Sequence, residues 1–193
     1  MATTGTNGTR SQAMRPFSRG NTPKEMPQRP AHLASRLLRS GVAGTLAGLA
    51  GVAAMTATME LYYRLLPQNE RWPLEPSLIV SRVTPSQLRA GEQGAQRHQA
   101  LTLAAHAGYG AASGVAYALT MGKAPLPTPI KGVGFGLGLF AVSYLGWLPT
   151  AGILSPATDY PASRNAGLIA AHLVYGAVTA FAADALIRTL AGD

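Results

Sequence analysis

The chain has 193 residues, of which 47% are hydrophobic and only 12% charged, whereas a soluble globular domain carries about 25% charged residues. This shortfall argues against a water-soluble enzyme. The net charge is +8, but the first forty residues hold seven basic side chains against a single acidic one, so most of the excess lies near the N-terminus. The chain has no cysteine, which excludes a disulfide framework, a thiolate metal site and a cysteine nucleophile.

Residues 1–39 predict a disordered, basic cytosolic tail. They lack an apolar stretch of signal-peptide length. Arginine and serine are frequent here and acidic residues nearly absent, so a mitochondrial transit peptide is the alternative. A continuous amphipathic helix is interrupted by Pro16, Pro23, Pro27 and Pro30. The tail has no aromatic pattern typical of a nucleic-acid binder, so we expect no nucleic acid as a partner.

Residues 40–190 predict an all-α, polytopic four-helix membrane bundle. Four segments have long central parts without charged side chains, each close to the ~20 residues that a helix needs to cross a bilayer. A soluble bundle would need charges along one face of each helix, and these central parts have none. The expected spans are residues 41–65, 98–121, 129–148 and 165–188, with an outer loop at 67–97 that contains two short helices, at 76–83 and 84–89.

The distribution of basic and aromatic residues predicts the orientation. Lysine and arginine concentrate on the cytoplasmic side of a membrane, and aromatic residues gather at its interfaces. The basic residues at the expected cytoplasmic ends are Arg29, Arg36, Arg39, Lys123, Lys131 and Arg188. The aromatic residues at the expected outer level are Tyr62, Tyr63, Trp72, Trp147 and Tyr160. We therefore expect a multi-pass protein of the bacterial inner membrane with both termini cytoplasmic; the mitochondrial inner membrane is the alternative.

A repeated motif links the second and fourth spans. At identical offsets, His106, Tyr109, Gly110 and Ser113 match His172, Tyr175, Gly176 and Thr179. The first and third spans also both open on a basic residue followed by a Gly-Val pair. Together these matches predict a duplicated two-helix hairpin with parallel repeats.

The repeated residues share one helix face, which we expect to face the bundle at one membrane depth, with Val115 and Phe181 turned toward lipid. Ionisable residues inside a membrane are functional candidates by default. The candidate intramembrane polar site is His106, Tyr109, Ser113, His172, Tyr175 and Thr179. The simplest role is structural, since each hydrogen bond between helices would contribute about 0.6 kcal/mol.

Two alternatives give the same residues a functional role. His106 and His172 would be the two axial ligands of a b-type haem; otherwise no cofactor or metal is expected. A small proton or ion transporter is the second alternative, with Glu60 as a weaker candidate that joins the two histidines. Arg64 follows Glu60 by four residues, which favours an interfacial ion pair instead. Asp184 and Arg188 repeat that spacing, and we expect them to form a second such pair.

Small residues at four-residue spacing predict where helices pack closely. Such pairs are Gly44 with Gly48 in the first span and Gly132 with Gly136 in the third. The sequence contains no recognisable Ser-His-Asp set, pair of catalytic carboxylates or zinc-ligand spacing. We therefore expect that the protein is not an enzyme.

The order of these features resembles the YagU-like group of uncharacterised inner-membrane proteins. The resemblance rests on Met59-Glu60 after a glycine-rich first span, on the motif that begins at His106, and on Trp147-Leu-Pro149. It implies a four-helix integral membrane protein with, for the group, a loose link to acid or envelope stress, and it transfers no catalytic residue. We expect a non-enzymatic protein with a structural or stress-related role. Its expected partners are membrane lipid and either further copies of the chain or another membrane protein.

Overall fold

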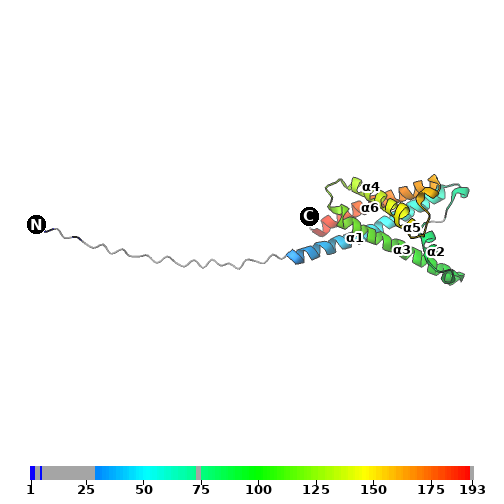
Figure 1. Ribbon diagram of the computed structural model, residues 1–193, viewed down its shortest axis with the longest axis horizontal. Coiled ribbons are helices and arrows are strands. Elements are labelled where there is room, and N and C mark those ends of the chain that lie inside the picture. Colours follow the sequence, from blue (N-terminus) through cyan, green and yellow to red (C-terminus); the bar gives the residue numbers. More distant parts are fainter. Residues whose placement is uncertain (3–4, 6–28, 73–74, 192–193) are drawn as a thin grey trace.

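The computed structural model describes residues 1–2, 5, 29–72 and 75–191, and its regular elements are helices (Figure 1). The long ones are α1 (Arg29–Leu65), α3 (Gly91–Leu119), α4 (Thr128–Ala141) and α6 (Ala162–Ala191). The shorter α2 (Glu75–Val83) precedes α3, and a π-helical segment, Val142–Trp147, joins α4 to the single turn α5 (Leu148–Thr150). The all-α class is confirmed for these residues.

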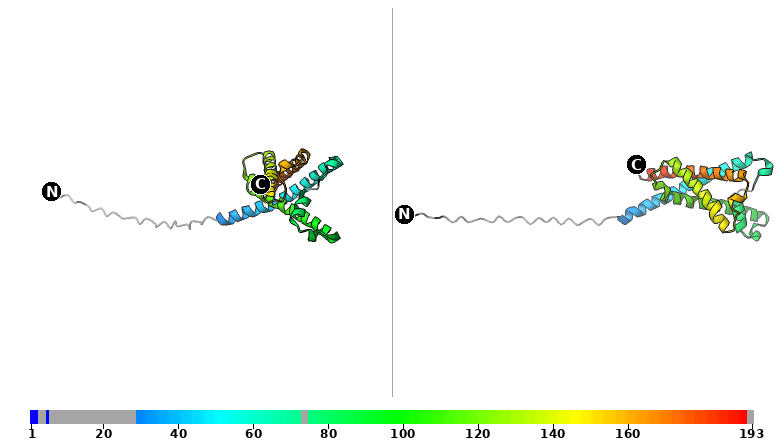
Figure 2. Two further views of the ribbon diagram at one scale, coloured as in Figure 1. Left: turned by 45° about the vertical axis from the view of Figure 1, so that its right-hand side comes forward. Right: turned by 45° about the horizontal axis from the view of Figure 1, so that its top comes forward.

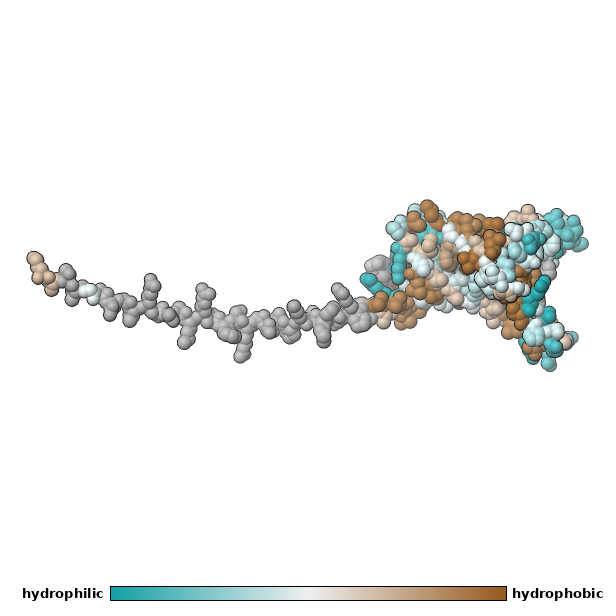
Figure 3. Space-filling view, in the orientation of Figure 1, coloured by the Kyte–Doolittle hydropathy of each residue, from teal (hydrophilic) through white to brown (hydrophobic). Residues whose placement is uncertain are grey.

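Three stretches of helix are long and apolar enough to cross a membrane, namely Leu33–Leu65, Thr128–Thr150 and Ala162–Leu190. Their outer surfaces keep large apolar side chains exposed, among them Leu46, Leu137 and Phe181. Figure 3 shows apolar residues along the helical part and hydrophilic residues toward its two ends. These properties indicate a membrane protein. The fourth expected span, α3, does not meet the same criterion, because histidine, tyrosine and glycine lower its hydropathy.

The helix boundaries differ from those expected at two places. Residues 29–39 belong to α1, so placing them in the tail was wrong; of the rest of that tail, residues 3–4 and 6–28 lie outside the described residues. Likewise, α3 begins at Gly91 and takes up the end of the expected 67–97 loop. Within that loop, α2 and a 3-10 turn at Ser86–Arg89 confirm the two short helices.

Glycines lie where the long helices cross. The helix α1 packs against α3 and α6, and α4 packs against α6. The backbones of Gly44 and Gly48 face the carbonyl groups of Gly114 and Gly110. In the second pair of helices, Gly132 and Gly136 face the carbonyl groups of Gly176 and His172. A methyl group at any of the four facing glycines of α1 and α4 would overlap backbone atoms, so these crossings require glycine.

The two crossings share one geometry. Gly48 meets the carbonyl of Gly110 and the Cα of the next residue, and Gly132 meets the carbonyl of Gly176 and the Cα of its next residue in the same way. Gly110 and Gly176 are also the two glycines that the sequence motif pairs. The motif therefore places equivalent glycines of α3 and α6 against the facing helices α1 and α4.

The π-helical segment redirects the end of α4 toward the interior. Buried residues follow a four-residue spacing from Gly132 through Gly136, Phe140 and Tyr144 to Leu148. A π segment adds a residue to a turn and is frequent at functional sites. Here it places Ser143, Tyr144 and Leu148 inside, at the end of the molecule where α2 lies; below, this end is called the α2 end.

Candidate functional site

A cavity of about 240 Å³ lies between the long helices toward the α2 end. The helices α1 and α3 are in contact at their glycine crossing and then diverge (Figures 1 and 2), because larger side chains replace glycine along both. Val52, Met55 and Met59 of α1 and Ala105 of α3 form part of the wall, which is mostly apolar. The cavity therefore lies where the glycines of the α1–α3 crossing give way to larger side chains, which keep the two helices apart.

Four of the six predicted polar-site residues line this cavity: His106, Tyr109, His172 and Tyr175. Ser113 and Thr179 lie one turn further from the α2 end and do not line it. Both are buried, and Thr179 packs against Gly51 of α1. The tertiary structure thus brings the two His–Tyr pairs to one place and leaves the hydroxyl residues outside it.

Hydrogen bonds across the cavity join helices that are distant in the sequence. The Tyr175 hydroxyl donates to the Gly110 carbonyl oxygen at 2.7 Å and so links α6 to α3. The hydroxyls of Tyr109 and Ser143 lie 2.9 Å apart and link α3 to the π segment. Ser143 was not predicted, because no local sequence pattern indicates a π segment.

His172 is almost fully buried, with 3% of its surface exposed. Its Nδ1 lies 2.7 Å from the Leu168 carbonyl oxygen, one turn earlier on α6. The ring packs edge-on against Phe140 and Tyr144, with centroid distances of 5.5 and 5.6 Å. His172 therefore faces the bundle, as expected.

His106 is less enclosed than its counterpart. It is half-buried, and its ring has no hydrogen-bond partner among the described residues. Phe181 faces outward, as expected, with 55% of its surface exposed. Val115 does not, because its backbone lies against Gly44 at the crossing, where the two helices are closest.

Further wall residues come from segments that sequence reasoning did not assign to the site. Tyr144, Trp147 and Leu148 enter from the π segment and α5. The helix α2 contributes Pro76, Ile79 and Val80 to the wall of the cavity. An apolar face on α2 was the available signal, but the sequence gives no indication of which helices it covers.

The haem alternative does not fit the cavity as it stands. Pockets for drug-sized ligands measure about 300–1,000 Å³, and a porphyrin is not smaller than such ligands, whereas this cavity has about 240 Å³. Glu60 gives no support to the alternative of a proton or ion transporter either. It forms the expected ion pair with Arg64 at 2.8 Å on the exposed surface, and it does not line the cavity.

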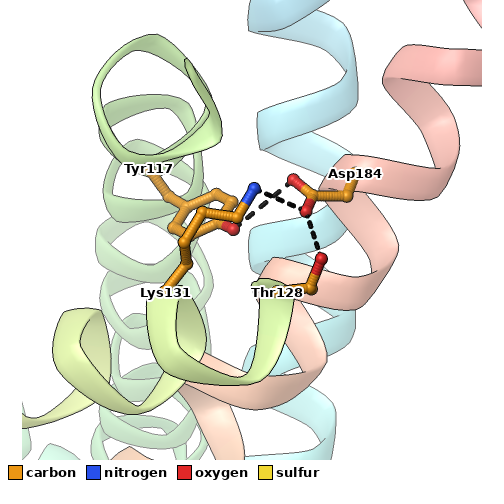
Figure 4. Close-up of polar contacts among 4 residues, drawn as sticks. All are labelled: Tyr117, Thr128, Lys131 and Asp184. Atoms are coloured by element: carbon orange, nitrogen blue, oxygen red, sulfur yellow. Dashed lines mark hydrogen bonds and ion pairs between the residues drawn. The ribbon is translucent and has the colours of Figure 1, made fainter. Parts of the chain in front are cut away.

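A buried ionic cluster lies at the opposite end of the molecule (Figure 4). Lys131 Nζ and Thr128 Oγ1 each donate to Asp184 Oδ2 at 2.7 Å, and the Tyr117 hydroxyl donates to Oδ1 at 3.4 Å. The cluster joins α3, α4 and α6. The expected pairing of Asp184 with Arg188 is wrong, because the tight packing of α4 on α6 brings the Lys131 ammonium to the carboxylate.

A second buried ion pair holds α2 in place. Arg164 at the start of α6 binds Glu75 at 2.7 Å, and each side chain is about 5% exposed or less. The Arg164 guanidinium also stacks on Tyr160, 3.5 Å from the ring centroid. Burial raises the pKa of Glu75 above its usual value, and the charge and hydrogen bond of Arg164 oppose that rise. The pair fastens α2 over the α2 end of the bundle.

Comparisons with protein-family models, with curated proteins and with solved structures found no match to this chain.

Proposed function

We propose that the chain is a non-enzymatic integral membrane protein in which four helical spans enclose a binding cavity for a small, largely apolar molecule. The observation that carries this proposal is the cavity itself, which has an apolar wall and a few convergent polar groups from α3, the π segment and α6. Binding sites for small molecules have this composition. The described residues that line it include no carboxylate and no serine–histidine pair in hydrogen-bond contact, which favours binding over catalysis.

The proposal counts α3 as a fourth span. The glycine crossing supports this, because α3 packs along α1 and returns the chain toward the end at which α1 begins. A helix of modest hydropathy inserts more easily as half of a hairpin whose partner is strongly apolar. The similar α1–α3 and α4–α6 crossings also support an ancestral duplication, and the basic residues at that end favour a cytoplasmic location for both termini in a bacterial inner membrane.

Cysteine labelling tests the number of spans, because the natural chain has no cysteine. Single variants Ala90→Cys, Pro125→Cys and Ser155→Cys place a thiol in each connection, where the native residues are exposed. Four spans require an impermeant maleimide to label Ala90→Cys and Ser155→Cys from outside intact cells and to leave Pro125→Cys unlabelled. Labelling of Ala90→Cys together with Pro125→Cys would show that α3 does not cross.

A cavity-filling variant tests the binding role. We expect p-cymene, an apolar single-ring probe, to bind the purified protein saturably in detergent micelles. Ala105→Phe places an aromatic ring at the cavity wall and should abolish that binding. Ala104→Phe makes the same change at the neighbouring exposed position, which does not line the cavity, and should leave binding intact. Absence of saturable binding to the unaltered protein would refute the role.

A further inference from the structure

His172 presents a hydrogen-bond acceptor to the cavity. A carbonyl oxygen has no hydrogen to give, so the 2.7 Å contact with Leu168 requires the proton on Nδ1. The described residues that line the cavity include no carboxylate to balance a charged ring, and the neutral ring therefore carries a lone pair on Nε2. Nε2 has no hydrogen-bond partner among the described residues. It is also not sealed inside the protein, so it faces the accessible space of the cavity.

Tyr109 and Ser143 present a hydrogen-bond donor to the same space. Two hydroxyl groups carry two hydrogens, and their mutual bond at 2.9 Å uses one of them. The second hydrogen stays available, because no other hydrogen bond from either hydroxyl occurs among the described residues. Tyr175 offers no such group, since its hydroxyl donates to the Gly110 carbonyl oxygen. The wall thus combines one acceptor with one donor.

The size and composition of the wall select a ring-shaped molecule. A cavity of 150 Å³ suffices for benzene, so about 240 Å³ holds one ring with small alkyl groups. Tyr144, Trp147 and His172 give the wall aromatic faces, on which a ring stacks well. Met55 and Met59 add sulfur atoms, which contact ring edges favourably.

The cavity wall reaches the surface of the protein at Tyr109 of α3 and Trp147 of the π segment. Their ring centroids are 6.3 Å apart, and they are 42% and 41% exposed. Both rings therefore form part of the outer surface as well as of the cavity wall. A molecule that enters here comes from the apolar surroundings of the helices rather than from water.

Resting on the proposed function, we propose that the cavity recognises a phenolic hydroxyl on a substituted six-membered ring. The hydroxyl donates to His172 Nε2 and accepts from the Tyr109–Ser143 pair, so a single group satisfies both partners. The source of this chemistry is either a free alkylphenol or the ring of a membrane quinol.

Thymol and p-cymene form a matched pair of probes, because thymol is p-cymene with one added hydroxyl group. The readout is the fluorescence of Trp147 in a Trp72→Phe background, which leaves a single tryptophan on the cavity wall. Both probes are compared at equal concentration within the micelle phase. We expect thymol to bind about tenfold more tightly, the equivalent of one good hydrogen bond.

Two variants locate the recognition. In His172→Phe and in the double variant Tyr109→Phe/Ser143→Ala, we expect the preference for thymol to disappear while p-cymene still binds. Tyr63→Phe removes a hydroxyl outside the cavity and should keep the preference. The double variant alters the exposed Tyr109, so it serves even if His172→Phe does not fold.

The outcomes separate this inference from the proposed function. Equal binding of thymol and p-cymene would overturn hydroxyl recognition and leave the binding role in place, whereas binding of neither probe would overturn both. Displacement of thymol then identifies the source. A quinol with a ten-carbon tail that displaces thymol better than the tail-free quinol assigns the site to membrane quinols, and equal displacement assigns it to free phenols.

Discussion

Arg164 and Asp184 lie twenty residues apart on α6, and each forms a buried ion pair with a residue of another helix. At 1.5 Å per residue this separation is about 30 Å, which equals the thickness of the hydrocarbon core of a bilayer. The two pairs therefore lie where the apolar part of α6 begins and ends. Glu75 holds α2 at one of these levels, and Lys131 holds α4 at the other.

The Lys131–Asp184 pair should tolerate joint replacement better than single replacement. Lys131→Met leaves the Asp184 carboxylate buried without its main partner, and loss of one member of such a pair costs about 3–5 kcal/mol. Lys131→Met with Asp184→Leu removes both charges, and we expect it to recover most of that loss. Thermal unfolding in micelles measures both. A double variant no more stable than the single one would show that the other Asp184 contacts dominate.

The Glu75–Arg164 pair should make stability depend on pH. Burial raises the pKa of Glu75 in the folded protein, so the folded state binds its proton more readily than the unfolded state. The contribution is fully present below the unfolded pKa and is lost as the pH rises through the folded pKa. The stability of the natural protein relative to Glu75→Gln should therefore fall as pH rises through this window. A difference that stays constant or grows with pH would contradict this.

Replacement of glycine by alanine should destabilise the protein at the helix crossings and have little effect on stability at neighbouring glycines. Gly48→Ala and Gly136→Ala place a methyl group on a facing carbonyl, and such overpacking costs about 1–3 kcal/mol. Gly41→Ala and Gly134→Ala are matched controls in the same two helices, because no atom approaches within 4 Å of the added methyl. Unfolding curves of the four variants provide the comparison. Equal effects at all four positions would argue against close packing at these crossings.

Removal of the Tyr175 hydroxyl should loosen the contact between α6 and α3. Tyr175→Phe leaves the buried ring in place and removes the donor to the Gly110 carbonyl. The expected loss is about 1 kcal/mol, the net contribution of a typical hydrogen bond. Tyr63→Phe is the control, because its hydroxyl makes no hydrogen bond to another described residue. Unfolding in micelles measures the difference between the two variants, and an equal effect would contradict the assignment.

Local pattern in the sequence determined the long apolar helices and most of the faces that they bury. Uncharged segments predict α1, α4 and α6, the four-residue glycine spacing predicts the crossings, and the His172–Tyr175 stripe predicts the buried side of α6. These features depend on neighbours within one or two helical turns, so a short segment of sequence is enough to predict them.

Only the tertiary structure decided which groups from different helices meet. Asp184 binds Lys131 rather than Arg188, and Tyr109 binds Ser143. The register of two packed helices depends on how all their side chains fit together, and a π segment shifts every residue that follows it. Helix register and the π segment together decide which polar groups meet in the cavity, and neither can be predicted from a local sequence pattern.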